Sequence, residues 1–151
     1  MRVLYSDADN VFVSEGSLVV QIRRGTMTHQ TLDLVDKHVL DPRSHPTALM
    51  VVFEESAVVP PADVRKRQQA LVKQVLAREG VHVAIVILAS GIMGTMLRTI
   101  SRTMSLTVWR TSTFASIEAA ARWLTPSAGL AAPTIVDTAE RARRERAAQR
   151  T

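Results

Sequence analysis

The first part of the chain alternates short β-branched runs with polar turns. NVFVSE at 10–15 and SLVVQIRR at 17–24 are β-branched runs separated by Gly16, and this pattern predicts a β-hairpin. VLYSD at 3–7 predicts a short edge strand in front of the hairpin, followed by turn-forming residues. The chain is therefore expected to begin with antiparallel strands.

Two runs further along the chain differ from these alternating segments, because their apolar residues follow one another with hardly any polar residue between them. TALMVVFEE at 47–55 and VHVAIVILA at 81–89 are the two examples. Runs of this length and composition are typical of strands that are covered on both faces. TVWRTS at 107–112 predicts one further short strand.

Four stretches between and after these strands have the periodicity of helices. Thr28 is expected to cap the first helix and Ser116 the last. Asp41 and Pro42 are expected to end the first, because a residue before proline leaves the α region. Gly80 is expected to end the second. The stripes that predict the first three helices are Leu32, Val35 and Val39; Val64, Leu71, Val72, Val75 and Leu76; and Met96, Leu97, Ile100 and Met104.

The predicted order of elements is β-β-α-β-α-β-α-β-α. Strands that alternate with helices of this length pair in parallel through right-handed crossovers. We therefore predict an α/β fold for residues 1–124, with a mixed sheet of about five strands and four helices mainly on one face. The Pro-, Gly- and Ala-rich stretch 125–133 predicts a linker. Residues 134–151 are Arg-rich with hardly any apolar face, and predict a basic helix or tail in solvent.

Composition narrows the classes of function. The 151-residue chain has no cysteine, which excludes disulfides, thiolate metal sites and thiol nucleophiles. Its four histidines lack metal-ligand spacing, so we expect neither a metal nor another cofactor. The N-terminus has no signal-peptide pattern, and no apolar run is long enough to span a bilayer. A cytoplasmic protein without a membrane span is expected.

The net charge of +5 is unevenly distributed. No Asp or Glu occurs between Gly80 and Ile117, while Arg98, Arg102 and Arg110 all fall there. Such a stretch suits an acidic protein surface; nucleic acid is not the partner we expect. The same lack of acids makes it hard to assemble two convergent titratable groups, so we expect a protein that is not an enzyme.

The succession of hairpin, helix, buried strand, helix, buried strand, helix, short strand and helix resembles the STAS domain, the fold of anti-sigma-factor antagonists. The likeness spans about residues 10–124. The three stretches that carry it are LVVQIRRGTMTHQTLDLVDKHV at 18–39, ALMVVFEESAVVPPADVRKRQQALV at 48–72 and MLRTISRTMSLTVWRTSTFASIEAAARWL at 96–124.

The resemblance implies a regulatory role. In the antagonists, the loop between the central strand and its helix reads roughly D-S-S-G, and a serine there is phosphorylated by a partner kinase. The matching positions here are Pro60, Pro61, Ala62 and Asp63, which include no phosphoacceptor. The residues themselves indicate a rigid turn, because each proline fixes its φ angle, and Asp63 is expected to cap the helix.

We therefore predict a non-catalytic, bacterial-type regulatory module that binds a partner protein. Pro60, Pro61, Ala62 and Asp63 would shape the contact. The cationic residues of the following helix would steer an acidic partner, and these are Arg65, Lys66 and Arg67. The N-terminal hairpin offers a further contact, through which the chain could form a homodimer.

A second interpretation stays open, namely a carrier or sensor of a small apolar or anionic ligand, as in lipid-carrier folds. A glycine turn at a helix N-terminus can hold an anion, although the G-x-x-G spacing matches neither the Walker nor the dinucleotide pattern. The residues of this candidate anion site are Ser90, Gly91, Gly94, Arg98 and Arg102. Met93, Met96 and Met104 would either fill the core or line an apolar pocket.

Overall fold

The computed structural model describes residues 1–41, 45–78, 80–107 and 110–148. Its centre is a mixed six-stranded sheet in which the strands lie side by side in their order along the chain. The first three strands pair antiparallel, and the last three join the third in parallel. The strands are β1 (Arg2–Ser6), β2 (Asn10–Glu15), β3 (Leu18–Arg23), β4 (Ala48–Phe53), β5 (His82–Ile87) and β6 (Thr111–Phe114).

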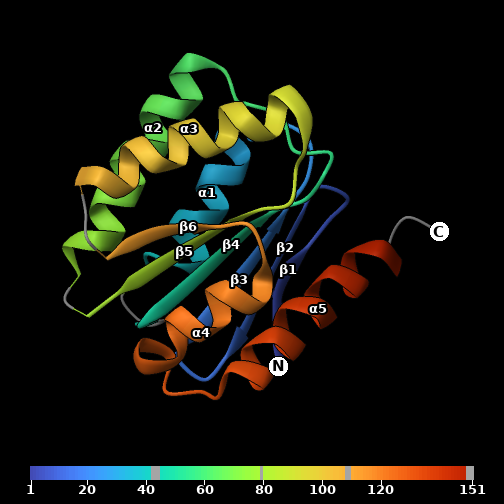
Figure 1. The fold of residues 1–151 in the computed structure, drawn as a ribbon, viewed down its shortest axis with the longest axis vertical. Helices are drawn as coiled ribbons and strands as arrows, with labels where there is room; N and C mark the ends of the chain where they lie inside the picture. Colours follow the sequence, from blue (N-terminus) through green and yellow to red (C-terminus); the bar gives the residue numbers. More distant parts are fainter. Residues whose placement is uncertain (42–44, 79, 108–109, 149–151) are drawn as a thin grey trace.

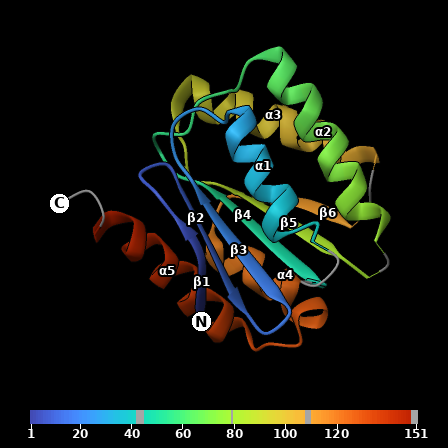
Figure 2. The same cartoon turned by 180° about the vertical axis from the view of Figure 1, so that it is seen from behind.

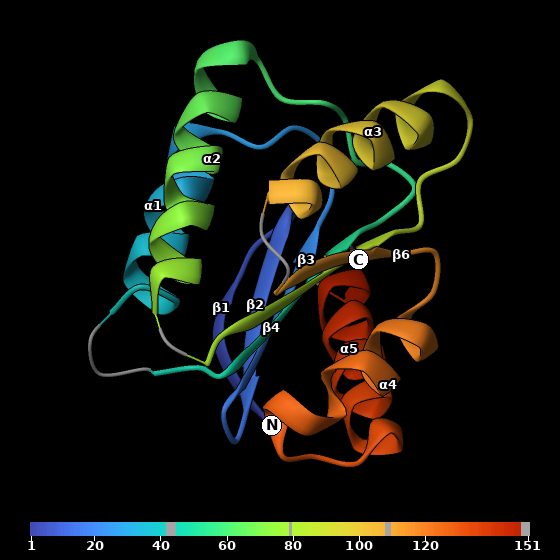
Figure 3. The same cartoon turned by 60° about the vertical axis from the view of Figure 1, so that its left-hand side comes forward.

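Helices cover both faces of the sheet (Figure 1). The three helices that connect the parallel strands lie on one face, because right-handed crossovers that always step in the same direction return on the same side. The two C-terminal helices lie on the other face, so that the molecule has three layers (Figure 3). The helices are α1 (His29–His38), α2 (Ala62–Ala77), α3 (Gly91–Thr107), α4 (Ile117–Ala128) and α5 (Ala132–Ala148).

The alternation of side chains along β3 separates two cores. Leu18, Val20 and Ile22 point to the layer of α4 and α5, and all three are fully buried there. The alternate residues of β3 point to the layer of α1 and α2, where Val19 belongs to a second apolar cluster. β3 is therefore covered on both faces, as a parallel-paired strand normally is.

The predicted α/β class is confirmed, with differences in detail. VLYSD contributes β1, so that the sheet has six strands among the described residues. The strand predicted at 107–112 begins only at Thr111, because Thr107 belongs to α3 and positions 108 and 109 lie outside the described residues. The described residues form five helices rather than four, and two of them cover the second face. Thr28 caps α1 as predicted, since its hydroxyl accepts from the amide of Thr31 at 3.3 Å, and the Thr31 hydroxyl accepts from the amide of Thr28.

The prediction of a linker at 125–133 is corrected by the structure. α4 continues to Ala128, and Gly129 ends it with a left-handed φ of +64°, so only residues 129–131 separate α4 from α5. α5 does not stand in solvent, because Ile135, Ala139 and Ala142 are fully buried against the sheet. Alanines at this spacing allow the helix axis to approach the strands closely, and the small face they form is easily overlooked in a sequence.

Candidate functional site

The turn before α2 begins the predicted contact surface. Pro61 occupies the N-cap position with φ −57° and ψ 158°, and Pro60 is buried behind it. Ala62 is the first helical residue and is exposed, like Asp63 and Lys66. Two fixed φ angles make this turn rigid, and residues 60–63 bring no hydroxyl, thiol or imidazole to its surface.

Asp63 does not occupy the N-cap position of α2, which is Pro61. Its carboxylate still interacts with free amides of the first turn, those of Asp63 and Val64, as predicted. The Asp63 carboxylate also lies 3.0 Å from Nε2 of His29, the first residue of α1. This contact lowers the pKa of Asp63 below its usual value, chiefly through the hydrogen bond from His29. The carboxylate also remains close to the positive end of the α2 dipole.

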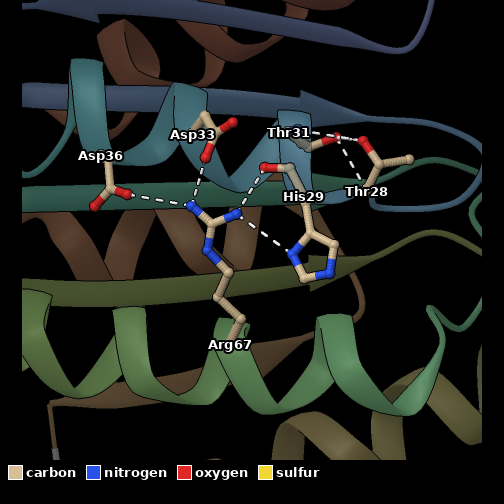
Figure 4. A network of polar contacts seen from close by, with 6 residues as sticks. All are labelled: Thr28, His29, Thr31, Asp33, Asp36 and Arg67. Carbon is tan, nitrogen blue, oxygen red and sulfur yellow. Dashed lines mark hydrogen bonds and ion pairs between the residues drawn. The ribbon is translucent and has the colours of Figure 1, made fainter.

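Arg67 is the centre of a polar network between α1 and α2 (Figure 4). Its Nη2 donates to Oδ1 of Asp33 at 2.5 Å and to Oδ2 of Asp36 at 3.4 Å. Its Nη1 donates to the backbone oxygen of His29 at 3.0 Å. The Asp33 carboxylate is the main reason why the pKa of Arg67 is raised. Because this guanidinium is bound within the protein, the cations that remain for a partner in the first two turns of α2 are Arg65 and Lys66.

A groove runs between α2 and α3. Arg65, Lys66 and Gln69 line it from α2, and Thr99 and Ile100 line it from α3. α3 diverges from α2 and crosses the β5–β6 end of the sheet (Figure 3). The side of α3 next to this groove is therefore not covered by another helix of the described chain.

Apolar side chains gather on this uncovered side of α3. Ile92 is 80% exposed, Met93 40% and Met96 43%. The side of α3 that packs on the sheet is formed by Gly94, Leu97 and Ser101, which are buried.

The expectation that the methionines fill the core is therefore wrong for Met93 and Met96. The two residues lie in solvent because the helix turns a different stripe toward β5 and β6. The side chain of Met104 lies outside the described residues.

The candidate anion site at the start of α3 is not assembled. Gly94 allows the start of α3 to pack closely against the backbone of Ala89, because a Cβ atom on it would lie 2.1 Å from the Ala89 oxygen. Arg98 folds back onto the same turn, and its Nη1 donates to the Ala89 oxygen at 3.1 Å. Ser90 and Gly91 are exposed ahead of the helix.

Arg102 is exposed one turn beyond Arg98. Arg98 is thus bound to the backbone of the turn. Among the described residues, no contact brings the guanidinium of Arg102 to the same place.

Sequence reasoning missed two polar residues inside the α1–α2 layer. Gln21 and Arg23 of β3 are only 2% and 4% exposed, and both line a pocket between the sheet and the two helices. Their signal was in the alternation of SLVVQIRR, which puts Val19, Gln21 and Arg23 on one face of a strand. That face becomes informative only once β3 is known to be covered.

Comparisons with known proteins assign the chain to no family. The sequence matches no family model, no curated protein and no solved structure. Within the described ranges, no three histidine or acidic side chains converge on a point that could hold a metal ion. No helix among these residues has both the length and the apolar character needed to cross a bilayer.

Proposed function

We propose that this protein is a non-catalytic regulatory module that binds an acidic partner protein through the α2/α3 face, which we define as Arg65, Lys66, Ile92, Met93, Met96 and Ile100. The observation that carries the proposal is the exposure of Ile92 together with both methionines. An apolar cluster of this kind on a protein surface marks a site of contact with another molecule.

Charge supports the class of partner. Arg65 and Lys66 lie across the groove from Ile100 of α3, and Arg102 is exposed further along α3. The sequence has no acid from position 80 to 117, and Asp63 is the only one in α2. A partner surface with apolar residues surrounded by carboxylates would complement this face, with the charges speeding encounter and selecting the partner.

The order of elements supports a relation to the STAS domain as part of this proposal. From β2 to α4 the chain follows the succession that the resemblance predicts: hairpin, helix, strand, helix, strand, helix, strand, helix. The module would act without the phosphorylation switch of the antagonists, since Pro60, Pro61 and Ala62 offer no hydroxyl. Binding would then be regulated by the supply of the partner or of a ligand.

Affinity purification from the native host tests the proposal. One variant, Ile92→Ser/Met96→Ser, removes the apolar stripe, and a second, Lys66→Glu/Arg102→Glu, reverses the charge beside it. We expect an acidic protein to be retained by the wild type, to be lost from both variants and to elute as salt is raised. Arg122→Glu, on exposed α4 of the opposite layer, is the matched control and should retain it.

The purified variants must first show the thermal unfolding of the wild type, which these exposed positions predict. Retention of the same proteins by all four chains would contradict the proposal. Dissociation of a homodimer by the Ile92→Ser/Met96→Ser change, detected by sedimentation, would also contradict it, because the face would then serve self-association instead.

A further inference from the structure

A narrow pocket lies on the sheet beneath α1 and α2, on the far side of α2 from the groove described above. Its cavity volume is only about 60 Å³, so it is a slot rather than a chamber, and it is partly open to solvent. α1 and α2 lie side by side over this part of the sheet (Figure 2). Side chains of both helices line the pocket and form its roof.

The floor of the pocket is a row of side chains across three strands. Gln21, Val51 and Ile85 are in register on β3, β4 and β5. Val51 lies in a central strand with helices above it, yet it is only half-buried, unlike the other five residues of β4. A half-buried valine at this place shows that the roof does not fill the space above the sheet.

Apolar groups make up nearly all of the pocket's walls. Leu32 and Val35 project from α1, and Leu71 and Val75 from α2. The pocket reaches solvent between the two helices, where half-buried Val72 also lines it. An aliphatic chain would find contacts on every side here, in a space that water can bind only weakly.

Arg23 places a positive charge at one end of this apolar space. It forms no ion pair with any carboxylate of the described residues, and it lies over the ring of Phe53 at 5.8 Å. With its oxygen turned toward the guanidinium, the Gln21 amide accepts from Nε of Arg23 at 2.7 Å and from Nη2 of Arg23 at 2.9 Å. Burial lowers the pKa of Arg23 to about 9, so the group is still charged at neutral pH.

A buried cation without an anion is costly, and proteins rarely keep one unless an anion arrives. Arginine has five N–H donors in a planar fork, of which Gln21 accepts from two. A carboxylate could accept from the remaining donors, while its chain fills the apolar space. We propose that this pocket binds a single-chain aliphatic carboxylate, with the head group at Arg23 and the chain along Val51 beneath α1 and α2.

Two arginines connect α2 to α1 and the residues that follow it, one at each end of the pocket. Arg67 connects α2 to Asp33 and Asp36 of α1, and Arg78 donates to the backbone oxygens of Val39 and Leu40 after α1. The contacts that Arg67 makes with Asp33 and Asp36 are exposed, so water can easily replace them. A ligand can therefore enter between the helices without unfolding either of them.

Isothermal titration calorimetry with decanoate tests the site. The wild type should bind decanoate at least tenfold more tightly than decanol, which has the same chain without the charge. Arg23→Met should weaken decanoate by at least tenfold and leave decanol nearly unchanged. Arg24→Met is the matched control, because Arg24 is the next residue but pairs with Glu54 at 3.5 Å; it should bind decanoate like the wild type.

Methyl NMR of the wild type gives a second readout that needs no variant. Decanoate should shift the methyl resonances of Val51 and Ile85, which face the pocket, and leave Val20 and Val52 of the other core unshifted. Equal affinity for decanoate and decanol, unchanged binding by Arg23→Met, or shifts confined to the other core would each overturn the proposal. It does not depend on the α2/α3 face, whose variants should bind decanoate normally.

Discussion

The amide oxygen of Gln21 accepts two hydrogen bonds from Arg23, at 2.7 Å from Nε and 2.9 Å from Nη2, within the layer between the sheet and helices α1 and α2. Both residues come from the same face of β3, and both are almost inaccessible to solvent. A neutral amide orients the guanidinium but does not neutralise it. This pair therefore leaves a positive charge in an apolar environment, and the stability of the protein should reflect that.

Replacement of Arg23 by Met should stabilise the protein in the absence of ligand. The change removes a buried charge that no carboxylate of the described residues compensates, and the methionine side chain fits the apolar surroundings. We expect the free energy of unfolding to rise by about 1–3 kcal/mol. Urea unfolding at neutral pH measures it, with Arg24→Met as the comparison. A loss of stability in Arg23→Met would show that the guanidinium is fully compensated in the folded protein.

The advantage of Arg23→Met should depend on pH. The folded pKa of Arg23, about 9, lies well below the ordinary value that the group has in the unfolded chain. Between these values the unfolded wild type keeps a proton that the folded wild type has lost, so the stability of the wild type rises with pH. The difference between variant and wild type should be full at about pH 7 and smaller at about pH 10. Unfolding of both chains at both pH values checks this, and a constant difference would refute it.

Gly94 should tolerate no side chain. A Cβ atom there would lie 2.1 Å from the oxygen and 2.7 Å from the carbonyl carbon of Ala89, and both are backbone atoms that cannot rotate away. Gly94→Ala should lower the free energy of unfolding by about 1–3 kcal/mol. Thr95→Ala, on the exposed side of the same turn, should change it by less than about 0.5 kcal/mol. Equal effects of the two variants in thermal unfolding would contradict this account of the turn.

The packing of α5 should contribute substantially to stability. Ile135 is fully buried in the same cluster as Val11 and Val20 of the sheet. Ile135→Ala should cost about 2–5 kcal/mol, because it leaves a cavity between α5 and the strands. Arg144→Ala, on the exposed side of α5, should change the free energy of unfolding by less than about 0.5 kcal/mol. A small loss in Ile135→Ala would indicate that α5 is only loosely attached.

Much of the fold could be predicted from periodicity. The apolar runs at 47–55 and 81–89 became β4 and β5, and the stripe that includes Leu32 became the buried side of α1. Capping by Thr28 and Ser116 was also predicted and is confirmed by hydrogen bonds from Thr31 and Ala119 amides. These features depend on neighbouring residues alone, so the sequence contains them directly.

The remaining features depend on contacts between distant segments. α5 looked solvated because alanines form its buried face, and only the sheet beneath them makes that face a core. Asp63 was expected to cap α2, but Pro61 is the N-cap residue, and the contact of Asp63 with His29 joins two helices. Met96 belonged to the stripe that predicted α3, and Met93 was expected in the core, yet the direction in which α3 crosses the sheet leaves both exposed.

Photo-crosslinking from position 92 tests most directly whether the α2/α3 face binds a partner. A photoreactive phenylalanine analogue replaces Ile92 in one chain and Arg122, on the opposite layer, in another; both positions are exposed. After irradiation in the native host, the first chain should form one predominant adduct with an acidic protein, and Lys66→Glu should diminish it. An adduct of equal yield from both positions, or none from position 92, would contradict the proposed function.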